Sequence, residues 1–489
     1  MLLAWHHGRM AAHSRIGGRA LADLLPELRS MPGPVYVALA HAVTSLVIDG
    51  RIVTETRLPS ERELATALGL SRATVTAAYD QLRSEGFLAS RTGSGSYVTV
   101  PAGAEPRPSF AGWKLPGIEG ADVIDLSCGA LPAPPELIPV TVEAASRRLA
   151  PYLLGDGYEP AGLPVLREAV AARFTARGVS TRPEQILITN GSLHGLDLLL
   201  RLLLGPGDRV ITELPSYPGA LDAVRANGGR LVPVPMAPEG GWQLEQLQAT
   251  LRQTAARLAY LTPDFHNPTG ALVPAADRRE VFRTARQTGT TVVVDESFVD
   301  LGFGVGERAS AELDPGVVTL GSLSKPVWGG LRIGWLRAST DLVHRLAALR
   351  TSIDMGGAVL DQLVAALLFE NLDRITAQRI AQLAPQRDAL IAALRRELPG
   401  WRFPVPQGGL SLWVELPAPL STPLCMVAAQ AGVVLVPGSR FGVDGTLERF
   451  LRLPYALPAE RLTEAVQRLG RAWRQLDGSG LAARQLVVA

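Results

Sequence analysis

The stretch SLSKPVWGGLRIGW, residues 322–335, decides how this chain is interpreted, because it contains one of two lysines in 489 residues. Lysine and arginine together number 48, and all except Lys114 and Lys325 are arginine. Arginine stays protonated in proteins, whereas lysine can lose its proton and attack a carbonyl group as an amine. Lys114 lies among prolines and is interpreted as linker. Lys325 is therefore the candidate nucleophile, and the alternative is a leftover surface lysine in an arginine-biased sequence.

The chain around Lys325 alternates between strand-like and helical runs from residue 123 onward. The strand-like runs are 186–189, 209–212, 258–261, 291–294, 317–320 and 331–335, and helical runs include 193–204 and 276–287. This alternation predicts an α/β fold with a mainly parallel sheet. Ligands of such sheets bind at the carboxyl ends of the strands, so that edge is the expected site.

Polar residues follow several of these strands. Asn190-Gly191-Ser192 opens a helix after the first strand, and a helix N-terminus with its backbone N–H groups binds anions. Asn267, in Asn-Pro-Thr-Gly, follows the 258–261 run, Asp295 ends the next run, and Lys325 follows the one after. Each residue alone has a simpler explanation as a turn or a strand-end acid. Their order predicts that an anion pocket, an amide, a carboxylate and an amine converge.

This set resembles class I, fold-type I aminotransferases over about residues 123–475. The resemblance implies pyridoxal 5'-phosphate as cofactor, bound to Lys325 as an internal aldimine, with Asp295 pairing with the pyridine nitrogen. It implies Asn267 on the ring hydroxyl, Tyr217 stacked on the ring and Arg452 on a ligand carboxylate. The phosphate contacts that it implies are Gly191, Ser192, Leu193, Ser322, Arg332 and, from the neighbouring subunit, Tyr158. No metal ligand is expected.

One position departs from the family pattern. The family commonly has tyrosine three residues after the aspartate, where its hydroxyl donates to the ring hydroxyl of the cofactor. Here that position is Phe298, so the hydroxyl is lost, and proton transfer at the site is expected to change. His266, beside Asn267, is either a partial substitute or a structural histidine.

An earlier block, residues 31–100, has helix and hairpin signals. Ser60 and Glu63 form a capping box, with Glu63 reaching back to Ser60, for a helix over 61–68. Ser71 then caps a helix over 72–85, and two short strands, 87–90 and 96–100, follow around a glycine-rich turn. Helix, turn, helix and hairpin in this order predict a winged helix-turn-helix.

The stretches LPSERELA, residues 58–65, and LSRATV, residues 70–75, resemble the GntR family of winged-helix repressors. The resemblance implies that double-stranded DNA is a partner. The residues implied to contact it are Arg62, Ser71, Arg72, Thr74, Thr92 and Gly93. The start of a recognition helix meets base edges, and Gly93 and Gly95 would let the wing backbone approach DNA. Six arginines and six acids in this block leave a solvated helical face as the alternative.

The domains are therefore expected at 1–30 (an N-terminal extension), 31–100 (winged helix), 101–122 (proline-rich linker) and 123–489 (aminotransferase-like and dimerisation domain). Net charge is +2, so DNA binding must depend on local residues. No membrane span or secretory signal is recognised, and two distant cysteines fit a reducing cytoplasm.

The fusion resembles the MocR subfamily of bacterial regulators. The resemblance implies a homodimeric transcription regulator that binds pyridoxal phosphate and senses an amine or amino acid effector, or the cofactor itself. The rival hypothesis is a working aminotransferase that carries a DNA-binding domain. A repressor that no longer binds cofactor is a third hypothesis, which the intact set of phosphate-binding residues disfavours. Sustained turnover with a keto acid distinguishes the first two.

Overall fold

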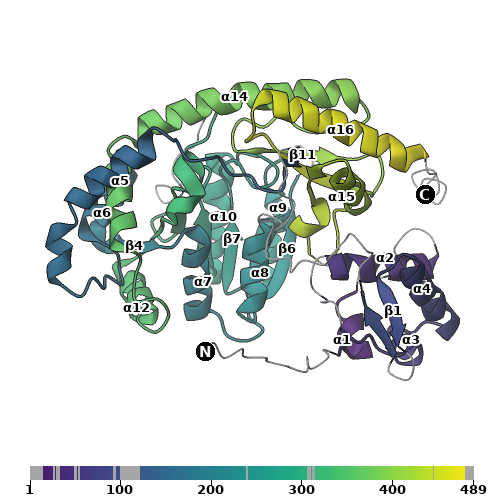
Figure 1. Ribbon diagram of the computed structural model, residues 1–489. Coiled ribbons are helices and arrows are strands. Elements are labelled where there is room, and N and C mark those ends of the chain that lie inside the picture. Colours follow the sequence, from purple (N-terminus) through teal and green to yellow (C-terminus); the bar gives the residue numbers. More distant parts are fainter. Residues whose placement is uncertain are drawn as a thin grey trace, which may run out of the picture. The chain divides into compact units, whose positions relative to one another are not determined.

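The computed structural model describes residues 15–25, 28, 34–48, 52, 56–91, 95–99, 122–237, 240–305, 310, 314–443 and 445–478. They divide into two compact units, one formed mainly by residues before 120 and one by residues after it. Figure 1 shows the smaller unit in purple, with α1 to α4 and the β1–β2 hairpin, and the larger unit in blue to yellow. The predicted linker lies almost entirely outside the described residues.

The smaller unit is a helix-turn-helix with a hairpin. Its helices are α2 (Val35–Ile48), α3 (Glu61–Leu68) and α4 (Arg72–Ser84). Apolar side chains from all three helices form one buried core, which includes Leu39, Val43, Leu64, Val75, Tyr79 and Leu82. The predicted helices at 61–68 and 72–85 are confirmed, the second ending one residue earlier, at Ser84.

Serine caps fix where the two recognition-motif helices begin. The Ser60 hydroxyl accepts from the Glu63 backbone N–H at 3.2 Å, and the Ser71 hydroxyl accepts from that of Thr74 at 3.1 Å. Each cap satisfies one of the N–H groups that the first helical turn leaves unpaired. Gly69 ends α3 at φ 62°, in the left-handed region that glycine tolerates.

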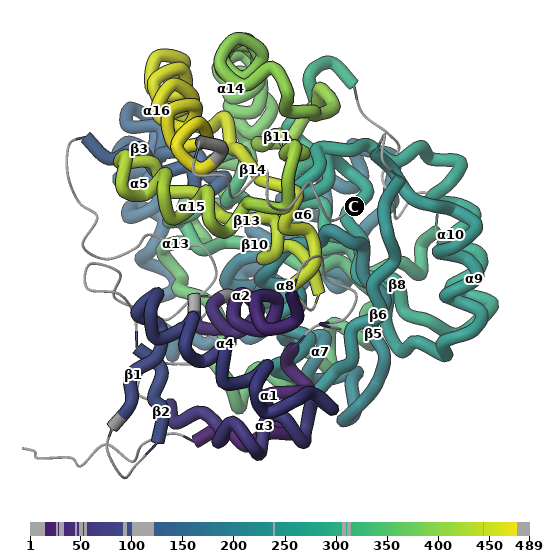
Figure 2. Tube along the Cα trace, turned by 90° about the vertical axis from the view of Figure 1, so that its right-hand side faces the viewer, coloured from purple at the N-terminus to yellow at the C-terminus, as the bar shows by residue number. Residues whose placement is uncertain are grey.

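Glu63 of the predicted capping box has a second partner. Besides the Ser60 backbone N–H, its carboxylate accepts from the Gly18 backbone N–H at 2.8 Å, at the start of α1 (Gly18–Ala22). The first turn of α1 offers an unpaired donor, and this bond lowers the pKa of Glu63. Leu21 of α1 is fully buried in the core, so part of the expected N-terminal extension packs on the winged helix, where Figure 2 shows α1 beside α3.

The wing is the antiparallel pair β1 (Leu88–Arg91) and β2 (Gly95–Val98). Its tip, with the predicted DNA contacts Thr92 and Gly93, lies outside the described residues. Gly95 has a role that the sequence did not reveal. A Cβ there would lie 2.9 Å from Nε of Arg57, so the glycine makes room for this guanidinium beside the last strand pair before the wing tip, Arg91 and Gly95.

The larger unit is built on a seven-stranded sheet in the order β4-β10-β9-β8-β7-β5-β6. All neighbours are parallel except β10, which is antiparallel to both β4 and β9. The strands are β4 (Ile186–Thr189), β5 (Arg209–Leu214), β6 (Arg230–Pro235), β7 (Leu258–Leu261), β8 (Thr291–Asp295), β9 (Val318–Ser322) and β10 (Gly334–Arg337). The mainly parallel α/β fold is therefore confirmed.

Alternate residues of the central strands face opposite helical layers. Leu258 and Tyr260 of β7 pack toward α7 (Ser192–Leu203), α8 (Pro218–Ala226) and α12 (Thr340–Arg350). Ala259 and Leu261 pack instead toward α9 (Leu244–Thr254) and α10 (Ala275–Thr288). This period of two is the strand pattern that buries both faces of a sheet.

The remaining elements cover the ends of this sheet. Residues 433–437 and 450–454 help form two small sheets, β11-β14-β13 and β12-β3. These strands are β3 (Ile124–Asp125), β11 (Ser411–Glu415), β12 (Val433–Val434), β13 (Val436–Pro437) and β14 (Phe450–Pro454). The other helices are α5 (Leu137–Arg147), α6 (Pro164–Ala176), α13 (Val359–Phe369), α14 (Leu372–Glu397), α15 (Ser421–Gln430) and α16 (Ala459–Gly478). Among the described helices, none is both long and apolar enough to cross a bilayer.

Candidate cofactor and DNA-binding sites

Lys325 lies just after β9, in a short π-helical turn, Ser324–Trp328. Its amine donates to the Gly129 carbonyl at 2.9 Å and lies 5.3 Å from the centroid of the Phe298 ring. Burial lowers the pKa of Lys325, because a low-dielectric surrounding disfavours the charged amine. The Lys325 amine is therefore partly desolvated and lies at the edge of the sheet where the parallel strands end.

Asp295 ends β8 and is 8 % exposed. One carboxylate oxygen accepts from the Tyr260 hydroxyl at 2.8 Å, and the other accepts from the Ser297 backbone N–H at 2.9 Å. Tyr260 was not predicted. Strand alternation was the available signal, because it places Tyr260 of β7 on the same face of the sheet as the last residue of β8.

The predicted anion site lies where β4 passes into α7. Gly191 has φ 89°, and a Cβ there would lie 3.0 Å from a guanidinium nitrogen of Arg332. The same nitrogen donates to the Asn190 carbonyl at 2.7 Å. The Ser192 hydroxyl accepts from that of Ser297 at 3.1 Å, which joins the start of α7 to the end of β8. The structure thus brings together Gly191, Ser192 and Arg332, as predicted.

The predicted strand at 331–335 begins too early. The strand β10 starts at Gly334, and residues 329–331 form a 3-10 turn that ends at Arg332 with φ 53°. This left-handed conformation turns the chain at Arg332, and the guanidinium meets the Asn190 carbonyl. The predicted phosphate contact Arg332 therefore sits in a bend before the strand.

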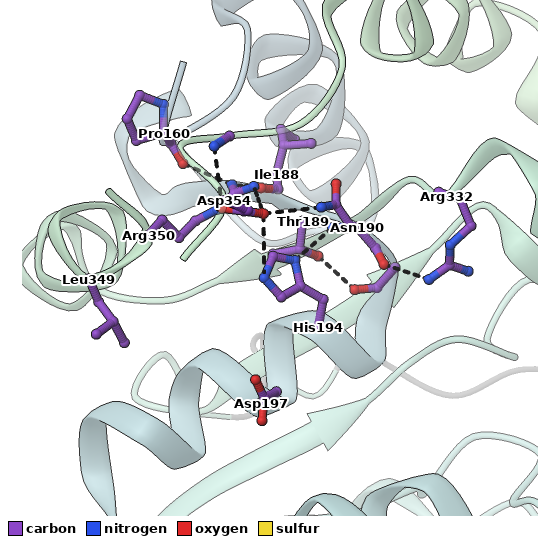
Figure 3. Close-up of polar contacts among 12 residues, drawn as sticks. Pro160, Ile188, Thr189, Asn190, His194, Asp197, Arg332, Leu349, Arg350 and Asp354 are labelled. Atoms are coloured by element: carbon purple, nitrogen blue, oxygen red, sulfur yellow. Dashed lines mark hydrogen bonds and ion pairs between the residues drawn. The ribbon is translucent and has the colours of Figure 1, made fainter. Parts of the chain in front are cut away.

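A partly buried polar network lies beside this site (Figure 3). Asp354 accepts from the Asn190 side-chain amide at 3.1 Å and from Arg350 at 2.9 Å through each carboxylate oxygen. Arg350 is fully buried and also donates to the carbonyls of Pro160 and Ile188. His194 accepts from the Asn190 backbone N–H at 3.0 Å. The network braces the backbone that forms the pocket, and sequence reasoning missed it.

The other predicted cofactor contacts differ in their surroundings. The Ser322 hydroxyl contacts the Ser324 hydroxyl at 2.9 Å and the Ile333 carbonyl at 3.2 Å, so it braces the loop that carries Lys325. Leu193 lies in the first turn of α7, where its N–H is free of an intrahelical partner. Asn267 precedes Pro268 in a tight turn after β7. Tyr158 is 57 % exposed.

Tyr217 begins α8 after β5, and a Cβ at Gly219 would lie 2.7 Å from its ring, so the glycine makes space for that ring. Burial, with a smaller effect of the Asp295 charge, raises the pKa of Tyr217 to about 12. The phenol therefore stays neutral near neutral pH and can donate a hydrogen bond.

Arg452 lies on β14 and is 8 % exposed. Its guanidinium donates to the Ser127 carbonyl and lies 5.0 Å from the Phe441 ring centroid. Burial lowers the pKa of Arg452 to about 10, and its Nε has no hydrogen-bond partner among the described residues. A buried guanidinium with an unpaired nitrogen suits an anionic ligand group. Residues 127–129 thus connect Arg452 to Lys325.

The contacts of His266 favour the structural interpretation. The side chain is 1 % exposed, and one ring nitrogen lies 2.9 Å from the Thr269 hydroxyl. The other lies 3.4 Å from the Glu213 carboxylate, which also accepts from Trp242 and from the Thr262 backbone. The contact with Thr269 joins His266 to the turn around Asn267, and the other nitrogen faces Glu213 without a hydrogen bond among the described residues.

In the smaller unit, the predicted DNA contacts that the structure describes lie at the starts of α3 and α4. Ser71, Arg72 and Thr74 occupy the cap and first turn of α4, and Arg62 lies in the first turn of α3. Both arginines are exposed. A recognition helix presents this end to the base edges of the major groove.

Comparison with known proteins identifies the family of each unit. Residues 121–469 match the family "Aminotransferase class I and II", and residues 35–98 match "Bacterial regulatory proteins, gntR family". The probable rhizopine catabolism regulatory protein MocR of Rhizobium meliloti is 29 % identical, with 91 % of this chain and 95 % of that protein covered. The uncharacterized HTH-type transcriptional regulator YisV of Bacillus subtilis is 30 % identical, with 86 % of this chain and 92 % of that protein covered.

The chain belongs to the MocR subfamily of GntR-type regulators. Among solved structures, LysN, the alpha-aminoadipate aminotransferase of Thermus thermophilus, is similar, at 35 % identity and a TM-score of 0.66. The match covers 73 % of this MocR-type chain and 94 % of LysN, which was complexed with N-(5'-phosphopyridoxyl)-L-leucine.

The aminotransferase family indicates pyridoxal 5'-phosphate as the cofactor of this MocR-type chain. The residues fit that group. The chain offers a desolvated amine at Lys325, a buried carboxylate at Asp295 and a helix N-terminus at Ser192. Among the described residues, no group of three or more His, Cys, Asp or Glu side chains could hold a metal ion.

Proposed function

We propose that this chain is a transcriptional regulator whose aminotransferase-like unit binds pyridoxal phosphate at Lys325 and responds to an amino compound by changing DNA binding. The observation that carries the proposal is the coexistence, in one chain, of a capped recognition helix and a site with Lys325, Asp295 and Arg452. A regulator needs both a reader of DNA and a sensor, and each unit supplies one.

Pyridoxal phosphate, when bound, supplies an electrophilic carbonyl and an electron sink. Lys325 would hold the cofactor through its amine, and burial lowers the pKa of that amine and so favours its neutral, nucleophilic form. Asp295 would pair with the pyridine nitrogen, and the hydroxyl of Tyr260 together with the N–H of Ser297 keeps its carboxylate oriented. Tyr217 would lie against the ring and Asn267 would donate to its hydroxyl. These two roles follow the family pattern.

The phosphate site combines three features of the chain. The first turn of α7 provides the backbone N–H groups of Ser192 and Leu193, and Arg332 adds a guanidinium at Gly191. Helix N-termini and guanidinium groups both favour dianionic phosphate. The Asp354 network holds Asn190 and therefore the pocket backbone in place.

Arg452 sets the class of effector. A guanidinium buried beside the segment that contacts Lys325 can hold a carboxylate while the amine of the same molecule reaches the cofactor. The proposed effector is therefore an amino acid. The proposed assembly is a homodimer, in which Tyr158, which is 57 % exposed, reaches the phosphate of the neighbouring subunit.

The test is a titration of the full chain, loaded with pyridoxal phosphate, with amines and amino acids, while the visible absorption and the anisotropy of labelled operator DNA are recorded. We expect one class of amino acid to shift the absorption band and the DNA affinity together. Lys325→Ala should leave DNA binding unresponsive to cofactor and to every amine, whereas Lys114→Ala, the matched control, should respond as wild type. An unchanged response of Lys325→Ala would overturn the proposal.

The second candidate is a catalytically active aminotransferase that carries a DNA-binding unit. It is favoured by the 36 % identity to the 2-aminoadipate transaminase of Thermus thermophilus over 71 % of this chain. Phe298, in contact with Lys325, weighs against it, because the phenyl ring cannot exchange a proton. Full conversion of the absorption band to the pyridoxamine form, reversed by a keto acid, would establish the second function.

A further inference from the structure

Glu61, at the first position of α3, reaches across to the recognition helix α4. One of its carboxylate oxygens accepts from the Thr76 hydroxyl at 2.8 Å. The carboxylate also lies in the first turn of α3, where the partial positive charge of the helix favours an anion. It is therefore held at the junction of the two helices.

Two arginines of α4 lie on either side of this carboxylate. Nε of Arg72 is 3.7 Å from one carboxylate oxygen, and a terminal nitrogen of Arg83 is 3.7 Å from the other. The Arg72 side chain is 74 % exposed, whereas Glu61 is 23 % exposed. Arg72 thus extends into solvent beside a partly buried carboxylate, and the ion pair is the described contact that can orient its guanidinium.

Arg83 extends the same connection to the wing. Its Nε donates to the Ser90 hydroxyl of β1 at 3.0 Å, and a terminal nitrogen donates to the Ser96 hydroxyl of β2 at 3.3 Å. The Glu61 carboxylate of α3 is therefore connected to the recognition helix α4 and, through Arg83, to both wing strands. Figure 2 shows these elements together in the smaller unit.

We propose that Glu61 is a positioning residue that sets the DNA specificity of the winged helix by holding Arg72 and, through Arg83, the wing. This inference depends on the proposed DNA contact of Arg72. Sequence-independent affinity comes from phosphate contacts and specificity from base contacts. A carboxylate beside Arg72 repels phosphates, which weakens binding to any DNA, and it fixes the guanidinium for the base edge that the operator offers. Glu61 therefore raises the ratio of operator to non-operator affinity.

The experiment compares Glu61→Gln with wild type in the full chain. The amide oxygen can still accept from Thr76, so the contact between the helices is kept while the charge is removed. The probes are a duplex selected from a random pool by the wild-type protein and a scrambled duplex of equal length, at several salt concentrations. We expect scrambled-duplex affinity to rise and the specificity ratio to fall by about fivefold or more, comparable to one mismatched base pair. Glu61→Asp, which keeps the charge, should retain most of the ratio.

Glu85→Gln is the matched control, because it removes one acid from the exposed end of α4, where Glu85 contacts Gln81. Its ratio should equal that of wild type. An equal fall of the ratio in Glu85→Gln, or a lower melting temperature of Glu61→Gln with an unchanged ratio, would overturn the inference.

Arg72→Ala distinguishes failure of the proposed DNA contact from failure of the proposed role of Glu61. If Arg72→Ala leaves the affinity for the selected duplex unchanged, the proposed DNA contact of Arg72 is wrong. If Arg72→Ala weakens that affinity while Glu61→Gln keeps the ratio of operator to scrambled-duplex affinity, only the proposed role of Glu61 is wrong.

Discussion

The Lys325 amine has a lowered pKa because burial penalises its charged form. Only the neutral amine attacks a carbonyl, and a lowered pKa makes that form available at a lower pH than in free lysine. We therefore expect the rate of cofactor incorporation to rise with pH and to level off below about 10.4, the ordinary lysine value. Stopped-flow absorbance of apoprotein mixed with pyridoxal phosphate measures this rate, with a free lysine derivative as the control. A rate still rising above that value would contradict the assignment.

Tyr260 stabilises a buried charge, so its hydroxyl should matter more than that of an ordinary buried tyrosine. Tyr260→Phe removes the 2.8 Å hydrogen bond to Asp295. Hydrogen bonds to charged groups are worth about 1.5–3 kcal/mol, against about 0.5–1.5 kcal/mol for neutral ones. We expect the free energy of unfolding to fall by the larger amount and the cofactor to bind more weakly.

The matched control is Tyr455→Phe, because the Tyr455 hydroxyl donates to a neutral acceptor, the Gly408 carbonyl, and is equally buried. It should lose the smaller amount of stability in chemical denaturation and leave cofactor affinity unchanged. Equal effects of the two substitutions on cofactor affinity would show that Tyr260 acts only through the stability of the unit.

Arg452 makes a prediction about ligand chemistry. Arg452→Lys keeps the positive charge but loses the planar pair of donors that matches a carboxylate. We expect spectroscopic titrations to show that amino acids bind at least about tenfold more weakly, since a truncated buried charge pair costs about 2–5 kcal/mol. The decarboxylated amine of the same amino acid should bind as it does to wild type. Equal weakening for both ligands would place the carboxylate elsewhere.

Substitutions of the two capping serines can distinguish an effect on helix stability from an effect on DNA contact. Ser60→Ala and Ser71→Ala each remove one side-chain cap and should each lower the free energy of unfolding by about 0.5–2 kcal/mol. Only Ser71 is proposed to contact DNA. We therefore expect equal losses of stability in thermal melts, but a clear loss of operator affinity in Ser71→Ala alone. Loss of operator affinity in both variants would assign the effect to helix stability.

These helices also show what the sequence predicts well. Both caps, Gly69 and the spacing of apolar residues are local signals, and they place α3 within its observed bounds. The second partner of the Glu63 carboxylate, Gly18, was missed because it lies 45 residues away and belongs to a helix of five residues that has no strong periodicity. Local patterns could not reveal an additional donor from a distant segment.

The same distinction applies to the sheet and its site. Asp295, Lys325 and the Gly191 turn were predicted because each follows a strand at the ligand-binding edge. Tyr260, Asp354 and Arg350 were missed because they act by packing against other elements, and their partners depend on strand order. That order, β4-β10-β9-β8-β7-β5-β6, does not follow the chain. Arg332 was placed in a strand because its left-handed conformation has no signal in a non-glycine residue.

If effector binding and DNA binding are coupled, thermodynamic linkage requires that each changes the other. If an amino acid bound near Lys325 changes operator affinity by some factor, the operator must change the affinity of that amino acid by the same factor. Typical couplings of about 1–3 kcal/mol correspond to about 5- to 150-fold. We expect spectroscopic titrations with saturating operator to differ from those without DNA by the factor found in the DNA titrations. A scrambled duplex and the Arg72→Ala variant should remove the difference. Reciprocity holds for binding but not for turnover. An amino acid affinity that is the same with and without operator would therefore favour the aminotransferase hypothesis over the regulator hypothesis.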